Sequence, residues 1–318
     1  MKVERVDPLT VVDEAARILR AAWSPPAIHY TADYLRWQLG FPGTPARTVL
    51  ARIGSEAGGF AALTPRRLRV GGAVIEGHVL SFVAVRPTFR RRGLASRLYE
   101  EILLVLREEG LPAVVFAEAG SEAAQRPLHR AASRVGLGLR RLAPHLNYGF
   151  VARRSAIPGP LVAAEAPLER ALEAIEACDA ARVLWAAPDL ERLEHYGRDP
   201  RGRKFLAIKE DGRVTGAAMV FLSNIVSAQG MERIATLDSI FLPAPTADRL
   251  SALARAAAAA FVGQTTSPAV SAPSLATNDP AILRAAGFRP TGTVFDAFVC
   301  HPEGHPLADA DVTNLEVV

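Results

Sequence analysis

Residues 81–98 read SFVAVRPTFRRRGLASRL, and this stretch is the most informative part of the sequence about the fold. Apolar residues alternate in its first part up to Val85, as in a strand with two different faces, and Pro87 ends that strand. A turn that contains Gly93 follows, and from Ala95 onward the apolar residues recur at helical spacing. The sequence therefore predicts a strand, a tight turn and a helix in direct succession.

A junction of this kind favours binding of an anion. The first amide groups of a helix have no partner within the helix, and the helix dipole places a partial positive charge there. Gly93 lets the backbone approach a phosphate closely, and Ala95 is small for the same reason. Arg90, Arg91 and Arg92 add positive charge at the rim. The alternative interpretation is an arginine-rich surface turn without a ligand.

Composition indicates a globular protein with two domains. A chain of 318 residues fits two domains of about 150 residues each. With 49% hydrophobic residues and a net charge of +4, it can build two cores and carries too little charge excess to predict a nucleic-acid partner.

Cys178 and Cys300 have no metal or redox spacing, which favours two incidental thiols over a single disulfide. Neither a secretion signal nor a membrane span is evident, so we expect a cytoplasmic protein with no membrane partner.

The first half alternates between helical and strand periodicities. Two helices come first, three strands follow, and then a helix, a strand, a helix and a strand close the half. Gly136 marks the end of the last helix. The expected helices cover residues 11–23, 31–39, 95–108 and 122–135, and the expected strands cover 48–53, 59–70, 73–85, 113–117 and 139–151.

The second half repeats this order of elements, which predicts a duplicated domain. We expect domains over residues 1–152 and 168–300, a linker over 153–167 and a polar tail over 301–318. The expected helices of the second half cover residues 168–185, 189–196, 247–262 and 280–286, and its strands cover 204–209, 214–226, 234–242, 269–272 and 293–300.

The turn resembles motif A of the GCN5-related N-acetyltransferase (GNAT) superfamily, whose pattern is Gln/Arg-x-x-Gly-x-Gly/Ala. Here the pattern stands as Arg90-x-x-Gly93-x-Ala95. The six residues alone are a weak signal, but the elements before and after them follow the order of this family. The chain is thus identified as a tandem GNAT protein. The fold class implied is α/β (α+β), with two tandem GNAT folds that each have a mixed, mostly antiparallel central sheet flanked by helices.

The resemblance implies acetyl-CoA as a cosubstrate and no metal. The backbone of the strand over 73–85 would contact the pantetheine arm, and the amide groups of the turn that contains Gly93 would bind the pyrophosphate. The strand over 113–117 would splay from the strand over 73–85 and leave a wedge for the thioester. The expected cofactor-binding residues are Val83, Ala84, Val85, Arg90, Arg91, Arg92, Gly93, Leu94, Ala95 and Ser96.

Candidate proton-transfer groups are less well defined. Glu76 and His78 are the candidates for the general base; we expect them on one face of their strand, opposite Val79, Ser81, Val83 and Val85. The family often places its base near the position of Val79, so a bulge would be needed to turn either residue inward. The alternative is a polar outer face of a half-buried strand.

The family also carries a general-acid tyrosine four residues before the glycine that ends the second helix, and here that position is Ala132. His129 and Tyr148 are weak substitutes for it. The departure leaves a dedicated acid in doubt, although a thiolate is a good leaving group and water can suffice. Loop residues Trp23, His29 and Tyr30 are expected to meet the acceptor, whereas the nearby Tyr34 and Trp37 are expected in the core of two packed helices.

In the second half, the strand and Pro243 are present but no glycine or basic run follows, and Pro245 and Asp248 disfavour a pyrophosphate there. We therefore expect one donor site and a degenerate second copy. The predicted activity is transfer of an acetyl group from acetyl-CoA to a primary amine of a small molecule, by direct attack of the amine on the thioester. The protein is expected to be a monomer with two GNAT domains or a homodimer. The alternatives are a CoA-binding sensor or scaffold without catalysis, and an aminoacyl or peptidyl transferase of related fold.

Overall fold

The computed structural model describes residues 1–70, 73–142, 144–151, 161–178, 184–186, 189–273, 277, 279–308 and 315–316. The chain divides into two compact units, and neither is one continuous stretch of sequence. The first unit comprises Met1–Leu68, Val74–Pro144 and Phe295–Asp311, and the second comprises Arg69–Ala73, His145–Val294 and Val312–Val318.

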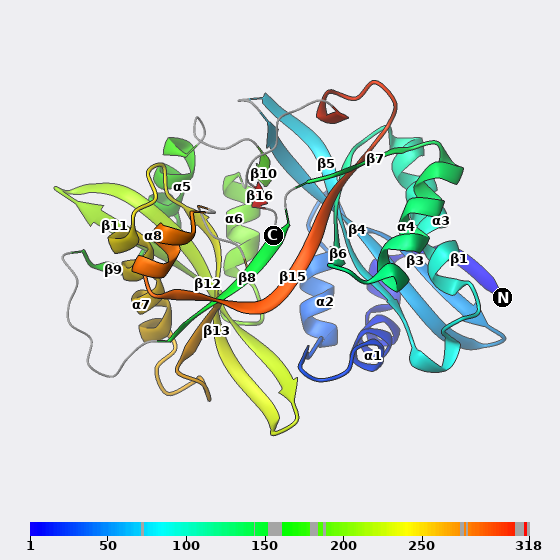
Figure 1. The fold of residues 1–318 in the computed structure, drawn as a ribbon, viewed down its shortest axis with the longest axis horizontal. Coiled ribbons are helices and arrows are strands. Elements are labelled where there is room, and N and C mark those ends of the chain that lie inside the picture. Colours follow the sequence, from blue (N-terminus) through cyan, green and yellow to red (C-terminus); the bar gives the residue numbers. More distant parts are fainter. Residues whose placement is uncertain are drawn as a thin grey trace. The chain divides into compact units, whose positions relative to one another are not determined.

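The first unit is built on a mixed sheet with the strand order β1-β3-β4-β5-β6-β15 (Figure 1). Strands β5 and β6 are parallel, and the other described pairs in this unit are antiparallel. The strands are β1 (Lys2–Val6), β2 (Ala27–Ile28), β3 (Arg47–Ile53), β4 (Glu56–Val70), β5 (Ala73–Val85), β6 (Ala113–Glu118), β7 (Gly138–Arg141) and the part of β15 (Phe288–His301) from Phe295 onward.

Helices cover both faces of this sheet. The core on one face contains buried residues of α3 and α4, and the core on the other face contains buried residues of α1 and α2. Each helix buries an apolar stripe, as its sequence periodicity predicts. The bounds are α1 (Val12–Ala22), α2 (Ala32–Leu39), α3 (Leu94–Glu109) and α4 (Glu122–Val135).

The second unit repeats this plan with the strand order β8-β14-β13-β12-β11-β9. Its main core joins these strands to α7 and α8. The strands are β8 (His145–Val151), β9 (Ala163–Glu165), β10 (Leu184–Ala186), β11 (Lys204–Glu210), β12 (Arg213–Ser227), β13 (Gly230–Phe241), β14 (Ala269–Ala272) and β16 (Leu315–Glu316), and the helices are α5 (Leu168–Ala177), α6 (Leu190–Gly197), α7 (Ala247–Ala260) and α8 (Pro280–Ala285). The predicted fold class, mixed sheets flanked by helices, is confirmed.

Each unit is completed by a strand from the distant half of the sequence. In the first unit, β15 pairs antiparallel with β6, from Phe295 opposite Glu118 to Cys300 opposite Ala113. In the second unit, β8 pairs antiparallel with β14, with Val151 opposite Ala269. The division at residue 152 expected from the sequence therefore differs from the structural one, because the last strand of each half satisfies backbone hydrogen bonds in the other unit.

Several element boundaries also differ from expectation. The helix expected over 168–185 ends at Ala177, and residues 184–186 form β10 instead. The strand expected over 139–151 is two strands, β7 and β8. Strand β1 was not predicted, because three of the five residues in its sequence KVERV are charged, as suits an edge strand. Part of the expected linker (152–160) and part of the expected tail (309–314 and 317–318) lie outside the described residues. None of the described helices has both the length and the apolar character of a membrane span.

Candidate functional site

The predicted donor turn lies at the start of α3. Gly93 is the N-cap residue with φ 76°, in the left-handed region that glycine adopts without strain. No side chain of the described residues caps this helix end, and its first turn has no acidic residue. The first backbone bond into the helix runs from the Arg97 amide to the Gly93 carbonyl, at 3.2 Å. The amides of Leu94, Ala95 and Ser96 therefore remain as donors for an anion.

The three arginines of the turn do not all serve the same purpose. Arg90 donates through Nε to the Val85 carbonyl, at 3.3 Å, and through Nη2 to the Ala22 carbonyl at the end of α1. Its side chain thus ties the turn to α1. Arg91, with φ 61°, and Arg92 are exposed and supply positive charge beside the helix end.

Strands β5 and β6 are paired over only part of their length. Their parallel register runs from His78 opposite Ala113 to Leu80 opposite Val115. No further pair between these strands is found among the described residues, although β5 continues to Val85. The resemblance implies a wedge for a thioester beside these unpaired ends of the two strands.

At Phe82, the side chains of β5 stop alternating regularly between the two faces of the sheet. The φ of Phe82 is 60°, which is unusual for a bulky residue. Before it, Leu80 packs in the α3 and α4 core; after it, Val83 and Val85 do so, while Phe82 and Ala84 pack with α1 and α2. Strict alternation would have put all the even-numbered residues on one face. The irregularity that the sequence hypothesis required is present, but it follows His78 in the strand, and the His78 side chain is buried against Glu109 at the far end of α3 from Gly93.

The two candidate bases lie far from the donor turn. The His78 imidazole is buried, and its Nε2 lies 2.7 Å from Oε2 of Glu109, at the opposite end of α3 from Gly93. Helix α3 has 16 residues and is therefore about 24 Å long. Glu76 is exposed and lies 3.7 Å from the Arg67 guanidinium. The register explains this placement, because His78 stands opposite the first residue of β6. We therefore assign the His78–Glu109 pair a structural role.

Burial of His78 predicts a pH-dependent stability. Burial lowers the pKa of His78 below its ordinary value of 6.5, and the Glu109 carboxylate opposes this shift. Protonation then favours the unfolded chain, so the stabilisation is complete above about pH 6.5 and is lost as the pH falls through the lowered pKa. His78→Gln keeps a hydrogen-bonding side chain without a proton to gain. Thermal melts between pH 5 and 8 should show a shallower loss in this variant than in the wild type, whereas His129→Gln should keep the wild-type slope. Equal slopes for all three proteins would contradict the prediction.

The two candidate acids are not brought to the turn either. His129, on α4, is exposed, and its ring meets the buried Phe298 ring edge to face at 5.5 Å. Tyr148 belongs to β8 and is buried in the core of the second unit, opposite Ala272. Tyr148 lies in the second unit because its strand, β8, pairs with β14 there, although the sequence had placed this strand in the first domain.

The predicted acceptor residues belong to a cluster of aromatic rings. The Tyr30 ring lies 5.9 Å from the Trp23 ring, and the Phe82 ring meets it edge to face at 5.6 Å. Tyr34 joins the same group, at 6.4 Å from Phe82 and 5.8 Å from Trp37. Trp37 is buried, as expected, and His29 is half-buried. Sequence reasoning missed Phe82, since nothing in its alternating strand distinguishes it from a core residue.

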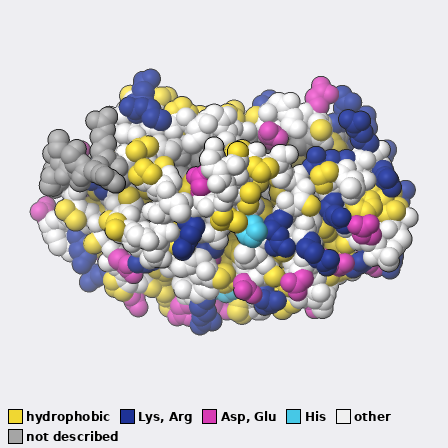
Figure 2. All heavy atoms as spheres, turned by 90° about the horizontal axis from the view of Figure 1, so that it is seen from below, with side chains coloured by type: hydrophobic (Ala, Val, Ile, Leu, Met, Phe, Trp, Pro, Cys, Tyr) yellow, Lys and Arg dark blue, Asp and Glu magenta, His cyan; other side chains and the backbone are white. Residues whose placement is uncertain are grey.

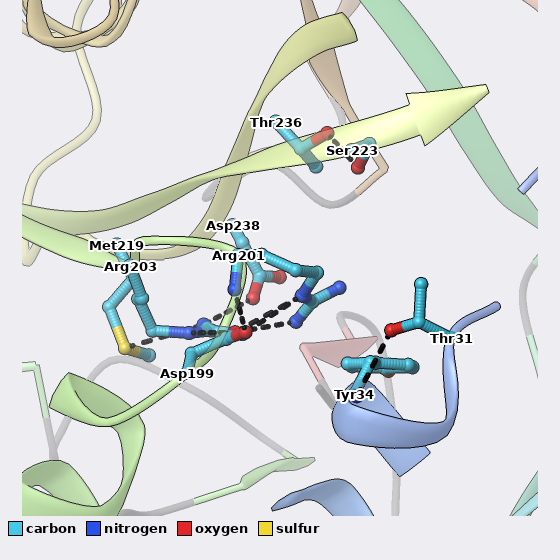
Figure 3. A network of polar contacts seen from close by, with 9 residues as sticks. All are labelled: Thr31, Tyr34, Asp199, Arg201, Arg203, Met219, Ser223, Thr236 and Asp238. Atoms are coloured by element: carbon cyan, nitrogen blue, oxygen red, sulfur yellow. Dashed lines mark hydrogen bonds and ion pairs between the residues drawn. The ribbon is translucent and has the colours of Figure 1, made fainter. Parts of the chain in front are cut away.

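The second unit retains the strand irregularity but not the turn. Ser239 of β13 has φ 48°, and the register with β12 shifts beside it. Helix α7 is capped by its own sequence, because the Thr246 hydroxyl accepts from the Arg249 amide at 3.3 Å. Beside Ser239, the Asp238 carboxylate accepts from the buried Arg203 guanidinium at 2.8 Å (Figure 3).

Neither the charges on one face nor the metal-binding groups among the described residues mark a second candidate site. On the face drawn in Figure 2, Lys and Arg side chains are interspersed with Asp and Glu side chains. Within the described part of the chain, no three His, Cys, Asp or Glu side chains gather in a way that could hold a metal ion.

Residues 9–120 match the sequence model of the acetyltransferase (GNAT) domain family. A structure of Saccharomyces cerevisiae N-myristoyltransferase with bound myristoyl-CoA and inhibitors aligns with a TM-score of 0.69 and 12% identity, over 99% of this chain and 86% of the other. A second structure of that protein, with bound myristoyl-CoA, gives a TM-score of 0.67 and 13% identity, over 99% and 89%. A comparison with curated protein sequences gives no match.

The family match over residues 9–120 gives the class of protein as an acyl-CoA-dependent acyltransferase. Residues 9–120 form a GNAT acetyltransferase domain, and the similarity to the two yeast structures extends the shared fold, though not the family assignment, over nearly the whole chain.

Proposed function

We propose that the first unit transfers an acetyl group from acetyl-CoA to the primary amine of a small molecule. The observation that carries the proposal is the uncapped start of α3, placed directly after a strand that separates from its neighbour. The amides after Gly93 bind the pyrophosphate, and Arg91 and Arg92 add charge at its rim. The backbone of Val83 to Val85 then lines the pantetheine arm, and the thioester lies in the wedge near Phe82.

The reaction is a direct acyl transfer. The amine nitrogen attacks the thioester carbonyl carbon, a nitrogen–carbon bond forms and the carbon–sulfur bond breaks. The proton lost by the amine passes to water, and the CoA thiolate takes a proton from solvent. The partners of the four candidate residues support this proposal: Glu76 lies beside Arg67, His78 is paired with Glu109, His129 packs on Phe298, and Tyr148 belongs to a strand of the second unit. We propose that the enzyme acts in the cytoplasm without a metal, as a monomer or homodimer.

The second unit is proposed to bind no donor. The Thr246 hydroxyl already occupies an amide of its helix start, and Asp248 in the first turn places negative charge where a phosphate would bind. The buried ion pairs around Arg203 fill the position beside its strand irregularity.

A second candidate is transfer of a longer acyl group to a peptide amine. The observation that favours it is the shared fold with N-myristoyltransferase structures that contain myristoyl-CoA. A third candidate, a CoA-binding sensor without catalysis, follows from the absence of a candidate acid or base at the turn among the described residues.

The three candidates can be separated by thiol release with matched donors. Acetyl-CoA, octanoyl-CoA and myristoyl-CoA are each combined with small amines or with peptides that have a free N-terminal glycine. The background is expected to be low, because Cys178 and Cys300 are buried and burial raises the pKa of the Cys300 thiol to about 12. We expect the highest kcat/KM with acetyl-CoA and a small amine. A preference for myristoyl-CoA and peptide would favour the second candidate, and donor binding without thiol release would favour the sensor.

A further inference from the structure

The aromatic cluster of the first unit connects a solvent-exposed surface to the donor strand. Trp23 is 43% exposed, although large aromatic side chains are usually well buried. The Trp23 ring packs beside the Tyr30 ring, and the Tyr30 ring packs against the Phe82 ring. Phe82 is the residue at which the side chains of β5 stop alternating regularly between the two faces of the sheet. We call Trp23, Tyr30, Tyr34 and Phe82 the aromatic wall. An acceptor that approaches the proposed thioester along this wall meets ring surfaces.

The rings of the aromatic wall pack against one another and do not form a cage around a cation. The rings of Tyr30 and Tyr34 meet the Phe82 ring at interplanar angles of 88° and 79°, so they use edges and faces on one another. A cage for an ammonium group needs several ring faces that surround one space. The exposed Trp23 instead offers surface on which one planar apolar group can stack.

Charges around the wall disfavour an acceptor with several positive charges. Arg20 donates to the Tyr30 carbonyl at 2.8 Å, and Arg90 donates to the Ala22 carbonyl, one residue before Trp23. The only acidic residue between positions 20 and 37 is Asp33, and it is paired with Arg36 at 2.8 Å. The two side chains that bond to the backbone beside the wall, Arg20 and Arg90, are both cations, and they disfavour an acceptor that brings several further positive charges next to them.

We infer that the acceptor is a monoamine that carries an aromatic ring, with the ring stacked on Trp23 and Tyr30 and the amine directed toward the thioester beside Phe82. This inference rests on the proposed acetyl transfer and narrows its substrate class. The ring supplies apolar contact that the wall can use, and the single amine avoids a second positive charge next to Arg20 and Arg90.

The test compares matched amines and variants of the wall. Acetyl-CoA-dependent thiol release is measured with 2-phenylethylamine, its saturated counterpart 2-cyclohexylethylamine, putrescine and spermidine. We expect kcat/KM for 2-phenylethylamine to exceed that for putrescine at least about 10-fold. Trp23→Ala should raise the KM for 2-phenylethylamine roughly 5- to 10-fold, as expected for a lost ring contact, while Trp23→Phe keeps most of the preference. Met231→Ala, which truncates a similarly exposed apolar side chain of the second unit, should change neither value.

Binding is measured separately from turnover, so that failure of the inference and failure of the proposed function are distinguishable. Isothermal titration calorimetry follows 2-phenylethylamine and putrescine into the CoA-saturated protein. Binding of 2-phenylethylamine that weakens in Trp23→Ala supports the inference even if no thiol is released, in which case only the proposed transfer fails. A preference for putrescine or spermidine, or a ring preference unchanged by Trp23→Ala, overturns the inference while leaving acetyl transfer intact. Absence of 2-phenylethylamine binding also overturns it.

Discussion

Gly93→Glu is expected to abolish measurable binding of acetyl-CoA, with Kd raised at least about 100-fold. The substitution places a carboxylate where the amides of the first turn of α3 would meet a pyrophosphate. Hydrogen bonds to a charged group contribute about 1.5–3 kcal/mol each, and loss of even two of them accounts for this factor. The added negative charge also repels the phosphates.

The backbone cost of this substitution is small and can be controlled. A Cβ at Gly93 meets no atom within 4 Å, so the only penalty to folding is the left-handed conformation, about 1–2 kcal/mol. Gly110, at the other end of the same helix, has φ 68° and equally open space. Gly110→Glu therefore carries the same backbone penalty without a carboxylate in the donor turn.

The measurement is a thermal shift and a calorimetric titration with acetyl-CoA. Wild type and Gly110→Glu should bind acetyl-CoA with similar Kd, and Gly93→Ala should lose much less affinity than Gly93→Glu. If Gly93→Glu binds acetyl-CoA as the wild type does, the donor site is not at this turn. If Gly110→Glu loses binding to the same extent, the effect belongs to helix stability instead.

The donor turn could be predicted from the sequence because its determinants are local. A strand with alternating apolar residues, a glycine at a turn and a periodic helix each leave a signal within a few residues of one another. Gly93 and the helix start thus have the conformation expected from the sequence. Phe82 has no such signal, because a left-handed phenylalanine is imposed by the surrounding sheet and is unfavourable in isolation.

The candidate acids and bases could not be placed from local sequence for a related reason. Which end of α3 meets His78 depends on the parallel register of β5 with β6, and that register joins residues more than thirty positions apart. The location of Tyr148 depends on the pairing of β8 with β14, which is more distant still. Non-local pairing is invisible to periodicity, so residues were assigned to the unit of their sequence neighbours.

Arg203→Met is expected to destabilise the second unit by about 3–5 kcal/mol, the range for removal of one partner of a buried ion pair. The Arg203 side chain is 1% exposed and is fully enclosed by its partners. Its Nε lies 3.1 Å from Oδ2 of Asp199, and its Nη1 lies 2.8 Å from Oδ2 of Asp238. Methionine fills part of the volume but leaves two carboxylates buried with one fewer cation.

Arg203→Met removes more electrostatic stabilisation from the Asp238 carboxylate than from the Asp199 carboxylate. Burial would raise the pKa of Asp199, but the hydrogen bond and charge of Arg201, with the charge of Arg203, hold this pKa below its ordinary value. Asp199 keeps Arg201 at 2.7 Å in the variant, whereas Asp238 loses the cation that approaches it at 2.8 Å. The double variant Arg203→Met/Asp238→Asn should therefore recover a substantial part of the lost stability, since it removes the uncompensated charge together with its partner.

Urea unfolding followed by circular dichroism measures these differences, and Arg170→Met is the matched control. Arg170 pairs with Glu173 at 2.6 Å, but both side chains are 47% exposed, so water and side-chain entropy offset most of the attraction. We expect the control to leave the unfolding midpoint nearly unchanged. An equally small effect of Arg203→Met would mean that the cluster beside Ser239 is hydrated, and the argument that buried ion pairs replace a donor site in the second unit would then fail. No recovery in the double variant would point instead to lost packing against the Tyr196 and Phe221 rings, which lie 5.2 and 4.6 Å from the guanidinium.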